Sequence, residues 1–174
     1  MLMMLSTNGG TMKVHGHGLR EHIRFLAPLL LFVMIVWILR MFLGVVSAPL
    51  WFSKLFSVSI ASVIALLIAI FWIHARSFGS YPNVVTASFL INAWTHLLII
   101  LAILFAVITG TENIFTRPEF SIKEDDALHL RHILGHLTFG IGANTLFGAG
   151  MGCLLLWLLR VIVPAPPQEK KTST

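Results

Sequence analysis

The stretch that decides the fold is residues 121–164, SIKEDDALHLRHILGHLTFGIGANTLFGAGMGCLLLWLLRVIVP. Residues four apart lie on one face of a helix, and that spacing gives a single stripe here. The stripe begins with imidazoles, passes through an amide and ends in glycines: His132, His136, Gly140, Asn144, Gly148 and Gly152. Most other positions are apolar. The pattern predicts a helix that crosses a membrane and packs this small, partly polar face closely against other protein.

The composition supports a membrane location for the whole chain. Hydrophobic residues make up 57% of it and charged residues only 11%, whereas about 25% of a soluble protein is charged. A spanning helix needs about 20 apolar residues, and four such runs are visible. The net charge of +5 comes from loops and tails rather than from a basic groove, so we expect no nucleic-acid partner.

We predict an all-α membrane protein, a bundle of four transmembrane helices within residues 23–163. The tails, 1–22 and 164–174, are expected to be flexible. The four spans are predicted at residues 23–46, 55–74, 84–108 and 137–161. A helix running from the capping box at Ser121 and Glu124 to Pro164 would be roughly 60 Å long, about twice the hydrocarbon thickness. We therefore expect a short amphipathic segment before the fourth span and a bend near Gly135.

The basic residues favour one orientation of these spans. Seven lie on the side of both termini: Lys13, Arg20, Arg24, Arg76, Arg160, Lys170 and Lys171. Five lie on the other side: Arg40, Lys54, Arg117, Lys123 and Arg131. Since positive charge is enriched on the cytoplasmic side, we expect a multi-pass protein of a bacterial inner membrane with both termini in the cytoplasm.

Three histidines before the fourth span form a candidate metal site. His129, His132 and His136 are spaced so that all three fall on one helix face, and neutral imidazole is a common metal ligand. The carboxylates of Asp125 and Asp126 are near enough in sequence to orient or complete such a site. The alternative is that these histidines only mark where the helix enters the headgroup region.

His96 lies in the middle of the third span, on the same face as Ser88 and Asn92. Ionisable residues inside a membrane are functional candidates, so His96 is a candidate to ligate haem, carry protons or contact a quinone. The alternative is a neutral histidine that is hydrogen-bonded as part of helix packing.

A haem b held by two histidines needs both at a similar depth, and five histidines are candidates. The set is His22, His74, His96, His132 and His136. We expect His96 and His136 to differ by roughly 15 Å in height. That difference disfavours their pairing and favours His22 with His74.

The preferred function is a non-catalytic subunit or accessory protein of a larger membrane complex. Small-residue faces on the second and fourth spans favour packing against other membrane subunits or a second copy, and no catalytic arrangement is visible. One alternative is an electron-transfer protein with a b-type haem or a transition metal. Another is a small oligomeric transporter whose polar path runs through Asn92, His96 and Asn144.

Overall fold

The structure is a computed structural model of the 174-residue chain, and it describes residues 13–14, 16–46, 48–116 and 130–163. Four helices in these residues are long and apolar enough to cross a membrane, by length and composition. They are Leu19–Val45, Trp51–Ala75, Tyr81–Thr109 and Leu130–Ile162. The helical fold class and the count of four apolar helices that the sequence predicts are both confirmed.

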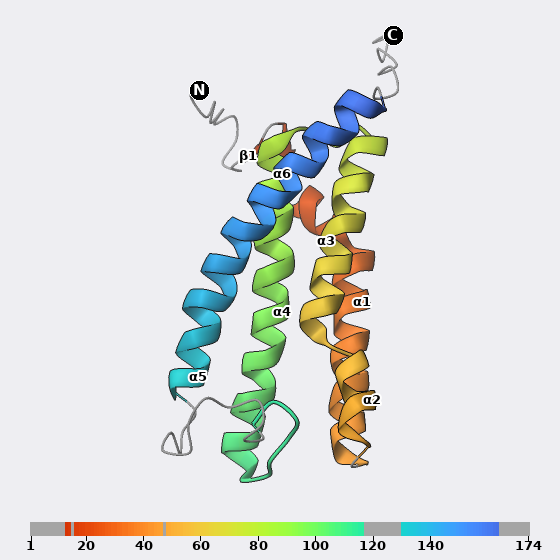
Figure 1. Cartoon of the computed structure of the whole chain (residues 1–174). Helices are drawn as coiled ribbons and strands as arrows, with labels where there is room; N and C mark the ends of the chain where they lie inside the picture. The colour runs from red at the N-terminus through yellow and green to blue at the C-terminus, as the bar shows by residue number, and fades with distance from the viewer. Residues whose placement is uncertain (1–12, 15, 47, 117–129, 164–174) are drawn as a thin grey trace.

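The elements follow one another in simple order along the chain (Figure 1). A short hairpin precedes the helices, and the last long helix is built from three consecutive segments. The elements are β1 (Lys13–Val14), β2 (His17–Gly18), α1 (Leu19–Val45), α2 (Leu50–Leu55), α3 (Val58–Ala75), α4 (Tyr81–Thr109), α5 (Leu130–Gly135), the π-helix η1 (His136–Ala143) and α6 (Asn144–Ile162).

The last helix differs from its prediction in two ways. It is helical from Leu130, about two turns before the expected start of the fourth span. Gly135 has helical dihedral angles, φ −58° and ψ −43°, so α5 runs directly into η1 without the expected bend. A long apolar helix accommodates its extra length by tilting, and this one leans across the others (Figure 1). The expected amphipathic segment falls largely on residues 121–129, which lie outside the described residues.

Local capping chemistry sets the ends of α4. The backbone N–H of Ser80 donates to Oδ1 of Asn83 at 3.2 Å, as in a capping box. At the other end Gly110 adopts φ +66°, a left-handed conformation that glycine adopts without strain. Both signals are local in sequence, so α4 begins and ends close to the predicted limits of the third span.

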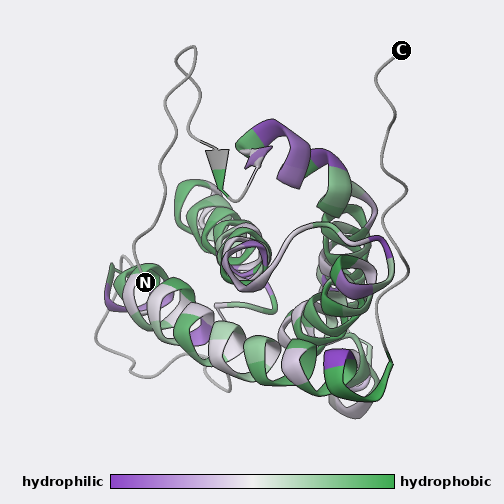
Figure 2. Ribbon diagram, turned by 90° about the horizontal axis from the view of Figure 1, so that it is seen from above, coloured by the Kyte–Doolittle hydropathy of each residue, from purple (hydrophilic) through white to green (hydrophobic). Residues whose placement is uncertain are grey.

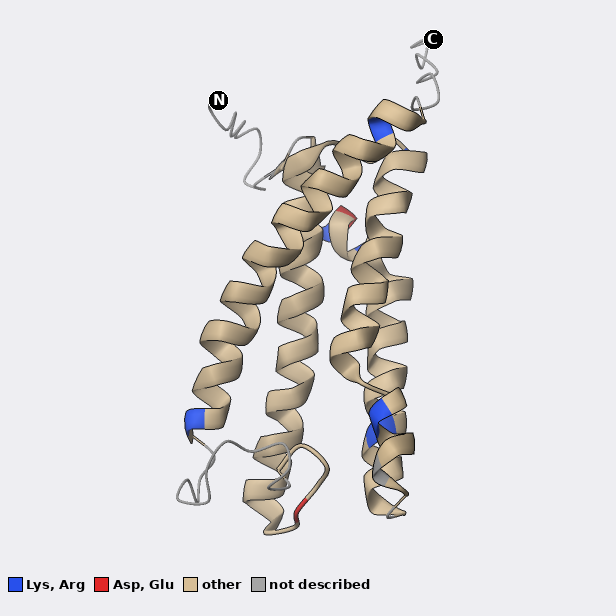
Figure 3. Cartoon of the chain, in the orientation of Figure 1, with Lys and Arg blue, Asp and Glu red and all other residues tan. Residues whose placement is uncertain are grey.

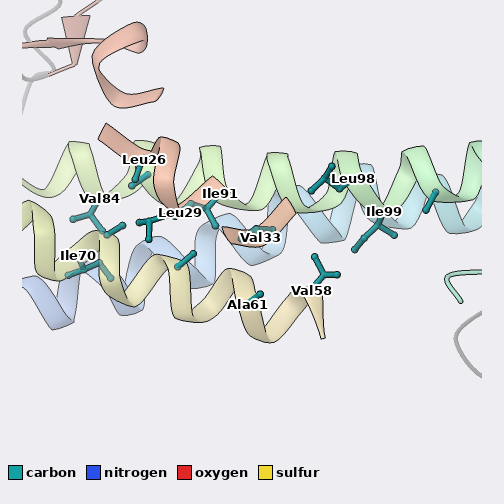
Figure 4. Packing of buried hydrophobic residues seen from close by; sticks show 14 of the residues in the cluster. Leu26, Leu29, Val33, Val58, Ala61, Ile70, Val84, Ile91, Leu98 and Ile99 are labelled. Carbon is teal, nitrogen blue, oxygen red and sulfur yellow. The ribbon is translucent and has the colours of Figure 1, made fainter. Parts of the chain in front are cut away.

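α4 is the central helix and contacts α1, α3 and α6. Figure 4 shows buried side chains from three helices meeting at this core. They are Leu26, Leu29 and Val33 of α1, Val58, Ala61 and Ile70 of α3, and Val84, Ile91, Leu98 and Ile99 of α4. The alanines of α3 that recur every four residues, Ala61, Ala65 and Ala69, are all buried. The small face of the second span is therefore used inside the chain.

The outer surface of the described residues suits lipid. Large side chains such as Ile108, Phe139 and Leu146 are more than three-quarters exposed, and the helices are hydrophobic along most of their length (Figure 2). In the described residues, charged residues occur towards the ends of the helices (Figure 3). Because soluble proteins rarely expose so much contiguous apolar surface, these features indicate a membrane protein.

Candidate functional site

The small-residue stripe of the last helix faces α4. A Cβ atom added to Gly140 would lie 2.6 Å from Cε1 and Nδ1 of His96. One added to Gly148 would lie 2.6 Å from Oγ of Ser88, and one added to Gly152 would lie 2.7 Å from Cγ1 of Val84. Only glycine permits such close approach. The stripe therefore packs inside this chain, mainly against its third span and also near Leu66 and Ile70 of the second.

A row of hydrogen bonds connects the middle of α4 to the last helix, through His96, His136 and Asn144. Nδ1 of His96 lies 2.8 Å from Nδ1 of His136, and Nε2 of His96 lies 3.1 Å from Nδ2 of Asn144. His96 is only 6% exposed, and its ring lies on the bare backbone of Gly140. The ring of His132 continues the row, with its centroid 4.9 Å from that of His136.

The prediction that His96 and His136 lie at different depths is wrong, since a nitrogen of one imidazole is in contact with a nitrogen of the other. The prediction placed His136 at the membrane entrance because it started the fourth span at residue 137. The helix instead begins at Leu130, and it crosses α4 at an angle (Figure 1). His136 is therefore nearly two turns inside the last helix and lies level with the middle of α4.

The π-helix η1 explains how one face of the last helix surrounds His96. In an α-helix of 3.6 residues per turn, residues four apart are offset by about 40°, so a stripe with that spacing drifts round the axis. The wider turns of a π-helix hold more than four residues and offset the stripe in the opposite sense. His136, Gly140 and Asn144 consequently all contact His96. Such π segments are frequent at functional sites.

The hydrogen bonds determine the tautomers along this chain. A neutral imidazole has one donor and one acceptor nitrogen. The Nδ2 amide of Asn144 donates to Nε2 of His96, so Nδ1 of His96 carries the hydrogen and donates to Nδ1 of His136. The opposite orientation of the Asn144 amide corresponds to the reversed set of donors and acceptors, with hydrogens on Nε2 of His96 and on Nδ1 of His136.

The other candidate histidines lie elsewhere. His22 is buried, with Nδ1 2.9 Å from the carbonyl oxygen of Gly18 and Nε2 3.1 Å from Nδ2 of Asn83. Both of its nitrogens are thus engaged within the protein. His74 is also buried, and in the described part of the chain neither of its nitrogens has a hydrogen-bond partner. His129 and the neighbouring Asp125 and Asp126 lie outside the described residues.

A cavity of about 600 Å³ adjoins the amide end of the histidine chain. It lies between α3, α4 and α6, and most of its lining is apolar. Its polar side chains are Ser59, Ser62, Asn92 and Asn144. Two residues of the polar path predicted from the sequence, Asn92 and Asn144, therefore meet at this cavity, and the third, His96, is bonded to Asn144.

Several contacts in the bundle carry no signal in the sequence. Asn83, the partner of His22, is 61 positions away from it, and Ser88 donates to the carbonyl oxygen of Thr145 at 3.1 Å across two helices. The cavity residue Phe147 looks like any lipid-facing side chain in the sequence. These contacts follow from the crossing of helices that are distant in sequence, so no periodicity or motif could have revealed them.

Within residues 13–116 and 130–163, excluding the undescribed 15 and 47, no group of three His, Cys, Asp or Glu side chains is arranged to hold a metal ion. Comparisons with protein-family models, with curated proteins and with solved structures find no match for this chain.

Proposed function

We propose that this chain is an integral membrane protein that handles protons along the polar path of Asn144, His96 and His136, extended by His132. The observation that carries the proposal is the contact of 2.8 Å between the imidazoles of His96 and His136, which lie within two helices long and apolar enough to cross a membrane. Burying such groups in an apolar span is unfavourable, and ordinary helix packing does not need them.

Imidazole suits this role because it can bind a proton on one nitrogen and release one from the other. His96 is hydrogen-bonded through both nitrogens, to His136 and to Asn144. A proton bound to His96 can therefore pass to His136 with no rearrangement of the backbone, whereas the amide of Asn144 orients the ring and does not itself carry a proton. The chain of bonds is also polarised cooperatively in surroundings of low dielectric constant.

The path opens towards one end of the bundle. His132 lies in α5, at the end of the molecule opposite the C-terminal end of α6 (Figure 1), and the path ends at the cavity beside Asn144. Beyond the cavity the last helix makes apolar contacts, with Gly152 against Val84 and Ile70. If both termini are cytoplasmic in a bacterial inner membrane, protons enter from the outer side.

Hydrogen exchange measures this access directly. The protein is labelled with ¹⁵N at His and Trp, placed in lipid bilayers and transferred to D₂O, and its ring N–H signals are followed by solid-state NMR. Trp94 is an internal control, because its indole N–H donates to the carbonyl oxygen of Leu30 at 3.0 Å, two residues from His96 but outside the histidine path. We expect the N–H of His96 to exchange at least tenfold faster than that of Trp94.

Two variants test the route. His136→Gln keeps a hydrogen-bonding partner for His96 but cannot relay a proton, so it should slow the exchange of His96 towards the rate of Trp94. His132→Gln alters the less buried end of the path and should slow exchange in the same direction, even if His136→Gln folds poorly. The proposal fails if His96 exchanges as slowly as Trp94 in the unaltered protein, or if neither variant changes its rate.

A second candidate function is binding of a transition metal or haem b for electron transfer, and the same histidine contact favours it. Metal ions hold imidazole nitrogens at about 2.0–2.1 Å, so two ligands of a tetrahedral ion lie about 3.3 Å apart. The 2.8 Å between His96 and His136 would need to open only slightly. A haem needs a larger change, because the ring of His96 is packed on Gly140. A visible spectrum with metal analysis of the purified protein tests both.

The role of a non-catalytic subunit stays a prediction. The small-residue faces that motivate this prediction pack inside this chain. On the second span, the face consists of the buried Ala61, Ala65 and Ala69; on the fourth, Gly148 and Gly152 lie against α4. They support the bundle itself rather than a docking surface. Partners in the bilayer would instead contact the exposed apolar faces. Migration as a lone monomer after mild detergent extraction would count against a membrane complex or self-oligomer.

A further inference from the structure

The cavity between α3, α4 and α6 has a volume typical of small-molecule sites. Its rim is formed by side chains that are well exposed at the outer surface, such as Val63 at 59%, Phe147 at 72% and Met151 at 53%. That surface is apolar and is the face offered to lipid. The cavity therefore opens sideways into the bilayer, and its natural ligands are molecules dissolved in the membrane.

The polar groups of the cavity offer hydrogen-bond acceptors. Nδ2 of Asn92 donates to the carbonyl oxygen of Ser88 at 2.9 Å, and Nδ2 of Asn144 donates to His96. In the part of the chain that the structure describes, the Oδ1 atoms of Asn92 and Asn144 accept no hydrogen bond. Asn92 is only 8% exposed and lines a largely apolar cavity, so its amide oxygen without a donor is unfavourable, whereas Asn144 is exposed; a ligand that brings a hydroxyl group to Asn92 therefore gains affinity.

Depth restricts the class of ligand further. Asn92 and Asn144 lie beside His96, in the middle of α4, and charged side chains are confined to regions nearer the helix ends (Figure 3). A phospholipid keeps its charged headgroup at the surface, so only its acyl chain could reach this depth. A neutral ring with hydroxyl groups and a hydrocarbon tail fits both the acceptors and the apolar walls. Phe147 and Met151 are suitable contacts for a flat ring.

We propose that this cavity binds a lipid-soluble quinol, with a ring hydroxyl donating to the amide oxygen of Asn144 or Asn92. The hydroxyl at Asn144 then lies beside the inner end of the histidine path, next to the residue that is bonded to His96. Binding of the quinol does not rest on the proposed function.

Binding is measured with a tritiated benzoquinol that carries a decyl tail, kept under anaerobic conditions. Retention by nanodiscs that contain the full-length protein is corrected for retention by empty nanodiscs. The matched probe is the dimethyl ether of the same quinol, which keeps the ring and tail but has no hydroxyl donor. We expect saturable binding of the quinol and at least tenfold weaker binding of the ether.

Two substitutions on α3 locate the site. Val63→Trp places a large ring at the rim of the cavity without altering the core, and it should weaken quinol binding at least tenfold. Ile60→Trp is the control, because Ile60 is similarly exposed, at 54%, but does not line the cavity. Asn92→Leu should weaken binding of the quinol and leave that of the ether unchanged.

The proposal is overturned if the quinol does not bind saturably, if the ether binds equally well, or if Val63→Trp and Ile60→Trp have the same effect. Equal binding of the ether would show that ring and tail alone fill the cavity. None of these results depends on proton exchange at His96, so failure here leaves the hydrogen-exchange test of the histidine path intact.

Discussion

Replacing Gly140 by alanine should dislodge His96. The added Cβ atom would lie 2.6 Å from Cε1 and Nδ1 and 2.9 Å from Cγ of the imidazole, and the ring is too deeply buried to move aside freely. Overpacking of this kind costs about 1–3 kcal/mol. Displacing the ring also weakens its bonds to His136 and Asn144, each worth about 0.5–1.5 kcal/mol. Because alanine has a higher helix propensity than glycine, the substitution offsets up to about 1 kcal/mol of this loss.

The expected net result is a loss of about 1–3 kcal/mol in the free energy of unfolding. Gly142→Ala is the matched control, because Gly142 belongs to the same π-helix and a Cβ there meets nothing within 4 Å. It should leave stability unchanged or raise it by up to about 1 kcal/mol. Unfolding of both variants in mixed micelles, followed by circular dichroism as the denaturing detergent increases, gives the comparison. Equal stability of the two variants would refute the close packing of His96 on Gly140.

Two further predictions concern stability. Gly152→Ala should lower the free energy of unfolding by about 1–3 kcal/mol, since its Cβ would lie 2.7 Å from Cγ1 of Val84, whereas Gly150→Ala should not lower it. The same detergent titration compares the two variants. If Gly150→Ala were the less stable of the two, the packing of α6 on α4 would be contradicted. Asn83→Ala removes the partner of Nε2 of His22 and the cap of α4, so it should cost about 1–3 kcal/mol. Thermal unfolding in detergent measures that loss, and an unchanged midpoint would show that the buried His22 does not need this bond.

Much of the helical organisation follows from composition and local signals. Four apolar runs of sufficient length predict the four long helices, because a bilayer leaves no other way to satisfy their backbone hydrogen bonds. The start of α4 near Asn83 and its end at Gly110 follow from capping chemistry that involves neighbouring residues. The stripe of Gly140, Gly148 and Gly152 likewise predicts close helix packing, and in the structure a Cβ at each of the three would lie within 3 Å of a side chain on another helix.

The candidate site was only partly predictable. The sequence identified Asn92, His96 and Asn144 as a polar path, and it identified His136 as a candidate ligand. It placed His136 and His96 at different depths, because the start of a span in an apolar sequence is uncertain by several residues and each residue shifts the depth by about 1.5 Å. The start of the last helix at Leu130 and its tilt removed that difference.

The amino-acid sequence by itself determined that the chain forms four long apolar helices and that one of them carries a face of small and polar residues. Only the tertiary structure decided what that face meets. The contact of His96 with His136, and the cavity beside Asn144, arise from helices that cross at an angle set by the fit of their side chains. Periodicity reports which residues share a face of one helix, but it contains no information about which face of another helix will lie opposite.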